Sequence, residues 1–198
     1  MALAFCNPLD LESLSLRLHF ASVDTFRKVT LMSPMTRLIA ELDREAVSTR
    51  RVLERVPGDK LDWRPHQKSL SAGQLAQHVA SIPAGMARMI GAEGMDVATR
   101  RPDYPPCENP TALLATFDAS VAAMRDFLSG LDDARANAPW RLSFGQREIF
   151  TMPRLDALRT MAFNHWYHHR GELVVYLRLL DVPVPAVYGR SADEQPFG

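Results

Sequence analysis

The segment Asn164-His165-Trp166-Tyr167-His168-His169-Arg170-Gly171-Glu172 carries three of the six histidines in a chain of 198 residues. Apolar residues recur at three- and four-residue steps on both sides of it, which predicts one long helix from about Arg154 to about Leu180. His165 and His169 are four residues apart, so they share a helical face, about 40° apart around the axis. Both fall within the apolar stripe, and we expect both imidazoles to face the core.

A buried imidazole needs a partner for each of its two nitrogens. Two imidazoles on one face suggest a partner that they share, and a metal ion is the simplest candidate. The alternative is a pair of core histidines that hydrogen-bond to side chains or water. The pair alone leaves both interpretations open.

The overall composition argues against several classes of protein. Hydrophobic residues make up 46% and charged residues 23%, as in an ordinary globular protein, and the length fits one domain. The formal net charge is zero, which argues against nucleic-acid binding driven by bulk charge. Cys6 and Cys107 form no CxxC pair, and no apolar run approaches the roughly 20 residues of a membrane helix. We therefore expect a cytoplasmic protein without nucleic-acid or membrane partners.

Three further amphipathic helices are predicted upstream, each opened by a serine or asparagine cap. They run from about Pro34 to Arg55, from just after Ser71 to about Gly91, and from Pro110 to about Gly130. Pro83 lies inside the second helix and should kink or divide it. Residues 1–34 show no clear signal-peptide pattern and are interpreted as an N-terminal extension, with the domain spanning 35–198.

Two segments between these helices are not helical in pattern. The polar, proline-containing connection 95–109 is long enough to cross one end of a bundle, so that the next helix runs parallel to the last. Residues 131–153 are irregular, and two short runs on either side of Gly145-Gln146 could form a hairpin. The predicted fold is an all-α four-helix bundle with a long crossover and a short irregular or hairpin segment before the last helix.

A third histidine, His78, lies on the apolar face of the second helix. Helix bundles often build metal sites from side chains on facing helices, so His78 could meet His165 and His169. Three neutral imidazoles suit zinc, nickel, copper or iron better than magnesium or calcium. Three protein ligands with an open position are typical of a catalytic metal site.

Glu172 and Tyr176 lie near the same face and are the candidate catalytic residues. Glu172 could accept a hydrogen bond from a ring N–H, act as a base or add a fourth ligand, and its alternative is a solvated or ion-paired glutamate. Tyr176 could donate to a bound anion or simply fill the core. The motif is not the HExxH of zinc peptidases, because Trp166 occupies the glutamate position.

Three motifs resemble the DinB/YfiT-like superfamily: Leu61–His66, Gln77–Ala80 and Asn164–Leu173. The resemblance spans roughly Met35 to Glu194. It implies a metal-binding four-helix bundle in up-down-down-up order, usually a homodimer, with nickel or zinc held by His78, His165 and His169. Glu172 departs from the glutamine that is frequent in relatives, which could alter the charge of the site or add a ligand.

The resemblance leaves three functions open. The first is a thiol-dependent S-transferase activity, in which one divalent metal per chain binds a low-molecular-weight thiol as thiolate to attack a small-molecule substrate. The second is a metal-dependent hydrolase, for which Glu172 is the sequence-near base. The third is a non-catalytic dimeric stress or binding protein in which the metal only joins two helices. For the first, Arg64, Lys68 or Arg141 are candidates to bind the carboxylate of the thiol.

Overall fold

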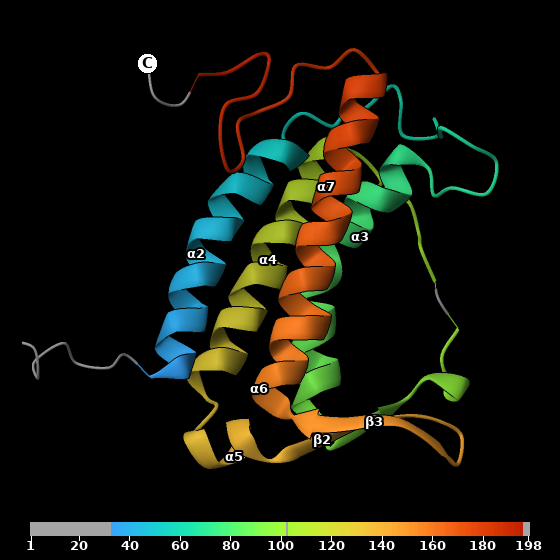
Figure 1. Ribbon diagram of the computed structural model, residues 1–198. Helices are drawn as coiled ribbons and strands as arrows, with labels where there is room; N and C mark the ends of the chain where they lie inside the picture. Colours follow the sequence, from blue (N-terminus) through green and yellow to red (C-terminus); the bar gives the residue numbers. More distant parts are fainter. Residues whose placement is uncertain (1–32, 102, 196–198) are drawn as a thin grey trace, which may run out of the picture. The chain divides into compact units, whose positions relative to one another are not determined.

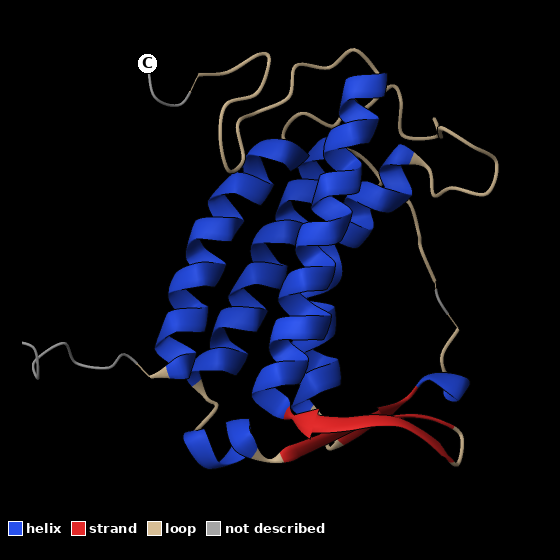
Figure 2. Ribbon diagram, in the orientation of Figure 1, coloured by secondary structure: helices blue, strands red, loops and turns tan. Residues whose placement is uncertain are grey.

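The computed structural model describes residues 33–101 and 103–195. Our interpretation of residues 1–32 as part of an extension lies outside these ranges and stays a prediction. The described chain is mostly helical and carries a small three-stranded sheet (Figure 1, Figure 2). Within it, no helix combines the length and the apolarity that crossing a bilayer requires.

Long helices make up most of the described chain, and the short elements join them at their ends. The helices are α2 (Pro34–Leu53), α3 (Ala72–Gly91), α4 (Pro110–Ser129), α5 (Asp133–Asn137), α6 (Arg154–Ala157) and α7 (Asn164–Leu179). The strands are β1 (Gly94–Asp96), β2 (Pro139–Phe144) and β3 (Arg147–Pro153), a 3-10 turn η1 (Val97–Thr99) follows β1, and a π-helical segment η2 (Leu158–Phe163) joins α6 to α7.

The predicted helix starts are confirmed by their caps. The Ser33 hydroxyl accepts the Thr36 N–H at the start of α2, and the Asn109 side chain accepts the Ala112 N–H at the start of α4. At α3 the capping box is complete, because Ser71 and Gln74 each accept the other's backbone N–H. The first helix ends at Leu53, slightly earlier than expected.

Contacts between distant residues fix the relative directions of the helices. Arg154 at the start of α6 donates to the Ile90 carbonyl near the end of α3, while Tyr176 near the end of α7 donates to Leu70 just before α3. The final helix therefore runs antiparallel to α3. The Cys107 N–H donates to the Gly73 carbonyl, so the connection returns to the beginning of α3 and α4 runs alongside it in the same direction (Figure 1).

Pro83 does not divide α3, which is continuous from Ala72 to Gly91. A proline removes the N–H that would donate to the carbonyl four residues earlier, here that of Val79. The indole N–H of Trp166 on α7 donates to this carbonyl instead, at 3.0 Å. The Ala84 N–H donates to the Ser120 hydroxyl on α4 at 2.8 Å. Two neighbouring helices thus satisfy backbone groups that surround the proline.

The segment before the last helix forms the hairpin that its sequence pattern favours, but the sheet is larger than a hairpin. β2 and β3 pair antiparallel around Gly145, whose φ is +60°. β1 pairs parallel to β2, from Gly94 opposite Arg141 to Asp96 opposite Ser143. The all-α prediction allowed for this hairpin but not for a third strand, which the first residues of the long connection form beside β2.

The last helix is not regular throughout, in contrast to the single regular helix that its sequence pattern predicts. The π-helical segment η2 holds more residues per turn than an α-helix, so the apolar face before it is out of phase with the face after it. The fully buried positions beyond it are Trp166, Arg170, Leu173 and Leu177. His165 and His169 flank this buried stripe and are only half-buried, so the expectation that both face the core is wrong.

Candidate metal centre

Three histidines from two helices come together at one side of the bundle. His78 is contributed by α3, and His165 and His169 by α7. One ring nitrogen from each can be chosen so that all three lie within 4.8 Å of one another. The ring centroid of His169 is 4.6 Å from those of both His78 and His165. The sequence pattern suggested that these three histidines could meet. They do so because α3 and α7 run antiparallel and in contact.

The spacing of these nitrogens fits a metal ion. The Nε2 atoms of His78 and His165 are 3.4 Å apart. Two imidazole nitrogens bound tetrahedrally to zinc at its usual bond length lie about 3.3 Å apart. A direct N–H···N hydrogen bond between the two rings is the alternative, and 3.4 Å is long for one. Such a bond would also leave the third imidazole outside the pair.

The surroundings keep two of the imidazoles neutral. Burial, and then the neighbouring His169 and His165, lower the pKa of His78 to about 4. Burial and the neighbouring His169 also lower the pKa of His165. Since a metal binds the neutral imidazole, both rings are in their ligand form at neutral pH.

Glu172 orients the third imidazole. Its Oε2 lies 2.6 Å from Nδ1 of His169, which places the ring N–H on that nitrogen and leaves Nε2 free to bind. Its other oxygen lies 3.2 Å from Nε2 of the exposed His168. Among the roles considered for Glu172, this geometry favours the acceptor of a ring N–H.

Tyr176 lies apart from the histidines. Its hydroxyl donates to the Leu70 carbonyl at 3.3 Å, and its ring packs edge-on against Trp63 at 5.6 Å between centroids. These contacts join the end of α7 to the segment before α3. The structure therefore gives Tyr176 a packing role at this position, and its catalytic role stays a prediction.

Arg170 is buried on the other side of α7 and ties it to α2. Its guanidinium donates to the Glu45 carboxylate at 2.7 Å and to the Thr49 hydroxyl at 3.0 Å, and it also contacts the Tyr188 hydroxyl. These contacts fix the rotation of the helix that carries His165 and His169.

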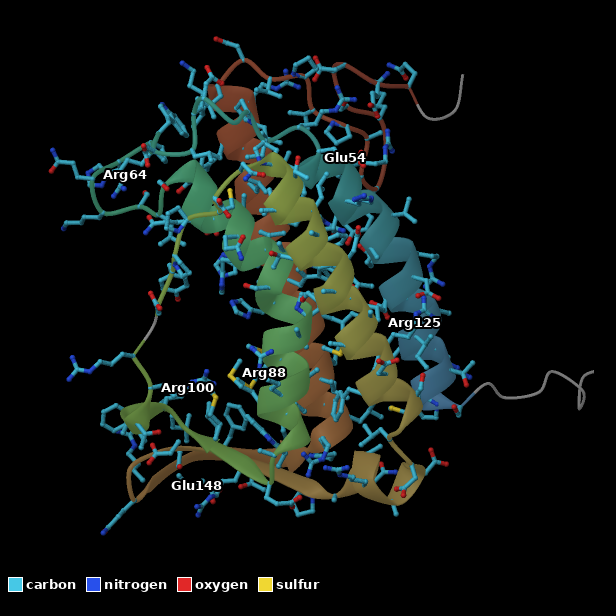
Figure 3. The ribbon with its side chains drawn as sticks, turned by 180° about the vertical axis from the view of Figure 1, so that it is seen from behind. Glu54, Arg64, Arg88, Arg100, Arg125 and Glu148 are labelled. Atoms are coloured by element: carbon cyan, nitrogen blue, oxygen red, sulfur yellow. The ribbon has the colours of Figure 1, made fainter. Side chains whose placement is uncertain are left out.

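A cavity of about 380 Å³ opens beside the histidines, within the usual size range of small-molecule sites. It lies between α3 and the long connection that Figure 3 shows standing alongside that helix. Its walls are His78, His165, Met86, Met89, Met95, Val97, Arg100, Arg101, Asp103 and Tyr104. None of Arg64, Lys68 and Arg141, which we considered as anion-binding residues, is among the residues that line it. Sequence patterns gave no signal for the connection residues, because that segment has no periodicity.

Together the fold and the site define a mostly helical protein with three clustered imidazoles beside an open cavity. Residues 41–173 match the DinB superfamily, and the chain belongs to this superfamily. No protein of curated function matches the chain.

Solved structures of DinB-like proteins have a similar fold. A DinB-like protein from Bacillus cereus ATCC 10987 is 23% identical, with a TM-score of 0.58 over 75% of this chain and 94% of its own. A DinB-like protein from Bacillus subtilis is 17% identical, with a TM-score of 0.58 over 78% of this chain and 99% of its own. At these identities the likeness concerns the fold alone.

Proposed function

We propose that this DinB superfamily protein binds one divalent transition metal, nickel or zinc, through His78, His165 and His169, and that it is a metal-dependent enzyme. The observation that carries this proposal is the mutual approach of the three ring nitrogens, within 4.8 Å, at the wall of a cavity. Three imidazoles would hold the metal and would leave a position for water or substrate, as in catalytic sites. A purely structural site would normally be closed by a fourth protein ligand.

The most suitable chemistry is thiol-dependent S-transfer. When bound, such a metal lowers the pKa of a thiol or a water that approaches it and so supplies a nucleophile near neutral pH. The protein's own residues have two further roles: Glu172 fixes the His169 tautomer, and the methionines give the cavity an apolar lining. A hydrolase would need a free base, and Glu172 is already engaged by two imidazoles, which favours transfer over hydrolysis.

We infer further that α2, α3, α4 and the α6–η2–α7 helix form the up-down-down-up four-helix bundle of this family, and that the protein is a cytoplasmic homodimer. Membership of the superfamily supports both inferences. Val47 on α2 and Val175 and Leu179 on α7 each expose more than half of their surface, which gives the described chain apolar side chains for an interface. Sedimentation at several protein concentrations tests the dimer.

The test of the metal site is elemental analysis of untagged protein beside His78→Ala and His169→Ala variants. We expect about one nickel or zinc ion per chain in the wild type and a loss in both variants. A panel of low-molecular-weight thiols with an electrophilic acceptor then tests transfer. A folded wild-type protein without metal would exclude both enzymatic functions, and a metal-loaded protein that turns over no thiol and no ester would favour the non-catalytic alternative.

A further inference from the structure

The cavity has a second chemical feature, on the wall formed by the connection between α3 and α4. We propose that it takes a small molecule with an apolar chain whose anionic end, a carboxylate or a phosphate, is bound by Arg100 and Arg101. This inference rests on the proposed function for the opposite end of the ligand, which faces the histidines. It adds the class of substrate to the metal site.

The wall is fixed at both of its ends, so it is part of the folded domain. At one end β1 pairs with β2. At the other end the Tyr104 carbonyl accepts the Gln74 side-chain N–H at 2.9 Å, and the Cys107 N–H donates to Gly73. The arginines lie between these two anchors. Figure 3 shows Arg100 on the connection beside α3 and Arg88 on α3 itself.

Part of the cavity lining is apolar. Met86 and Met89 come from α3, and Met95 and Val97 come from the connection. Unbranched thioether side chains adapt to ligands of different shapes, which makes methionine frequent at permissive binding surfaces. An alkyl or aromatic chain would therefore be accommodated between the histidines and the arginines.

The charges on the wall favour an anion. Among the described residues, neither Arg100 nor Arg101 takes part in an ion pair, whereas Arg159, Arg170 and Arg178 all do. The guanidinium of Arg100 donates to the Met95 sulfur at 3.4 Å, and a thioether is a weak acceptor. A carboxylate or phosphate is the natural partner for such a fork of donors.

One acidic residue, Asp103, also lines the cavity and opposes this preference in part. Its negative charge is outweighed by the two arginines of the wall. A second hollow adjoins the cavity, and Arg88 and Arg100 both line it. The formal charge of the named side chains around both hollows stays positive when Asp96 of the second hollow is included. The Asp96 carboxylate already accepts hydrogen bonds from the N–H groups of Ala98 and Gly145.

The experiment follows ¹³C-methyl NMR signals of the methionines during titration with hexanoate, hexyl phosphate, hexanol and hexylamine. The chain has nine methionines, so Met86, Met89 and Met95 report on the cavity, and Met35 and Met124 serve as internal controls. We expect the cavity signals alone to shift, with the better of the two anions binding about tenfold more tightly than hexanol and hexylamine binding most weakly. The anion preference should shrink at high salt.

The variant Arg100→Gln/Arg101→Gln should bind hexanol as the wild type does and lose the preference for anions to within roughly twofold. Arg64→Gln is the matched control, because this exposed arginine lies outside the cavity wall. Titrations are made on zinc-loaded and on zinc-free protein, since a carboxylate could also coordinate zinc. A preference that is absent in the wild type, or that survives in the double variant, would overturn the proposal.

The zinc content of the same samples separates this inference from the proposed function. If the protein holds no zinc but still prefers an anion through Arg100 and Arg101, the anion subsite is supported and the proposal of a metal-dependent enzyme is contradicted. If the protein holds zinc and shows no anion preference, the metal site is supported and the proposed anion subsite is contradicted.

Discussion

Glu172 is the residue on which the orientation of His169 depends. Removing an orienting carboxylate typically weakens metal affinity roughly 10- to 100-fold, because the ligand ring loses its fixed tautomer. We predict a loss of this order for Glu172→Ala and a smaller one for Glu172→Gln, whose amide oxygen can still accept the Nδ1–H. Competition with a chromophoric zinc chelator measures the affinity.

His168→Gln is the matched control for this prediction. His168 contacts the other oxygen of Glu172 but lies outside the three-histidine cluster, and 63% of its side chain is exposed. Its replacement should leave zinc affinity within about threefold of the wild type. If Glu172→Ala retained wild-type affinity, Glu172 would be no more than a partner in a surface ion pair.

A carboxylate on α2 gives the protein an acid-sensitive contact. Arg159 of η2 binds both oxygens of Glu41, with 2.6 Å between its Nη1 and Oε1, and the Tyr167 hydroxyl also donates to Glu41. The hydrogen bond from Arg159 lowers the pKa of Glu41 below its usual 4.5. The folded state thus holds the ionised carboxylate more strongly than the unfolded state does, so the contact stabilises the fold above about pH 4.5 and is lost as the pH falls through the lowered pKa.

We therefore predict that Glu41→Gln costs about 1 kcal/mol of unfolding free energy at pH 7, a modest value because Arg159 is partly exposed. The difference from the wild type should shrink as the pH falls below 4.5 through the lowered pKa of Glu41. Urea unfolding of chelator-treated protein across this range measures it, with Glu54→Gln, from an ion pair exposed on both sides, as control. If Glu41→Gln lowered the unfolding free energy equally at every pH, the charge of the Glu41 carboxylate would not be the source of the stabilisation.

The residues that sequence reasoning placed in the site are those that repeat with a helical period. His78, His165 and His169 follow from such periods, and the structure brings them together. Tyr176 was selected by the same reasoning, but a helical face does not say how far along the axis the site extends. Arg100 and Arg101 could not be selected, because a segment without regular structure has no period to indicate which side chains face inward.

At the scale of the elements, the contact between α3 and α7 includes a hydrogen bond that Pro83 makes possible. Its missing N–H leaves the buried Val79 carbonyl to the indole of Trp166, next to His165. We predict that Trp166→Phe lowers the unfolding free energy by about 1–3 kcal/mol beyond the loss of ring volume, since the carbonyl is left without a donor.

A double-mutant cycle separates the hydrogen bond from the packing. In a Pro83→Ala background the restored backbone N–H at this position can donate to Val79 as in a regular helix, so Trp166→Phe should cost at least about 1 kcal/mol less there than beside Pro83. The ring-volume effect is shared by both backgrounds and cancels. Urea unfolding without metal measures all four proteins, and strictly additive costs would mean that the indole N–H contributes nothing through Val79.

This pair also shows what a local pattern cannot predict. The sequence placed Pro83 correctly inside a helix, but the donor that replaces its N–H lies 83 residues further along the chain, at Trp166. The π-helical segment η2 was missed for a similar reason, because its residues form an acceptable α-helical pattern on their own.

At the scale of the whole described chain, the four long helices and their starts could be predicted, since caps and apolar stripes are local signals. The parallel pairing of β1 with β2 could not, because Gly94–Asp96 is too short for a strand pattern and its partner is far away in sequence. That pairing holds the connection beside α3 and so creates one wall of the cavity. The pairing that shapes the cavity was thus much less visible in the sequence than the histidines beside it.

The proposed metal site lies between α3 and α7, so metal binding there should stabilise the whole folded domain. Any ligand that binds only the native state adds RT ln(1 + [L]/Kd), about 2.7 kcal/mol at a free concentration of 100 Kd. For a domain of this size that corresponds to a rise in Tm of roughly 5–10 °C. We predict such a rise when zinc is added to chelator-treated protein at pH 7.5, and none beyond about 2 °C for His78→Ala. His66→Ala, which changes an exposed histidine outside the cluster, should respond as the wild type does. A full rise in His78→Ala would mean that zinc stabilises the protein from another site, and the three-histidine centre would then have to be abandoned.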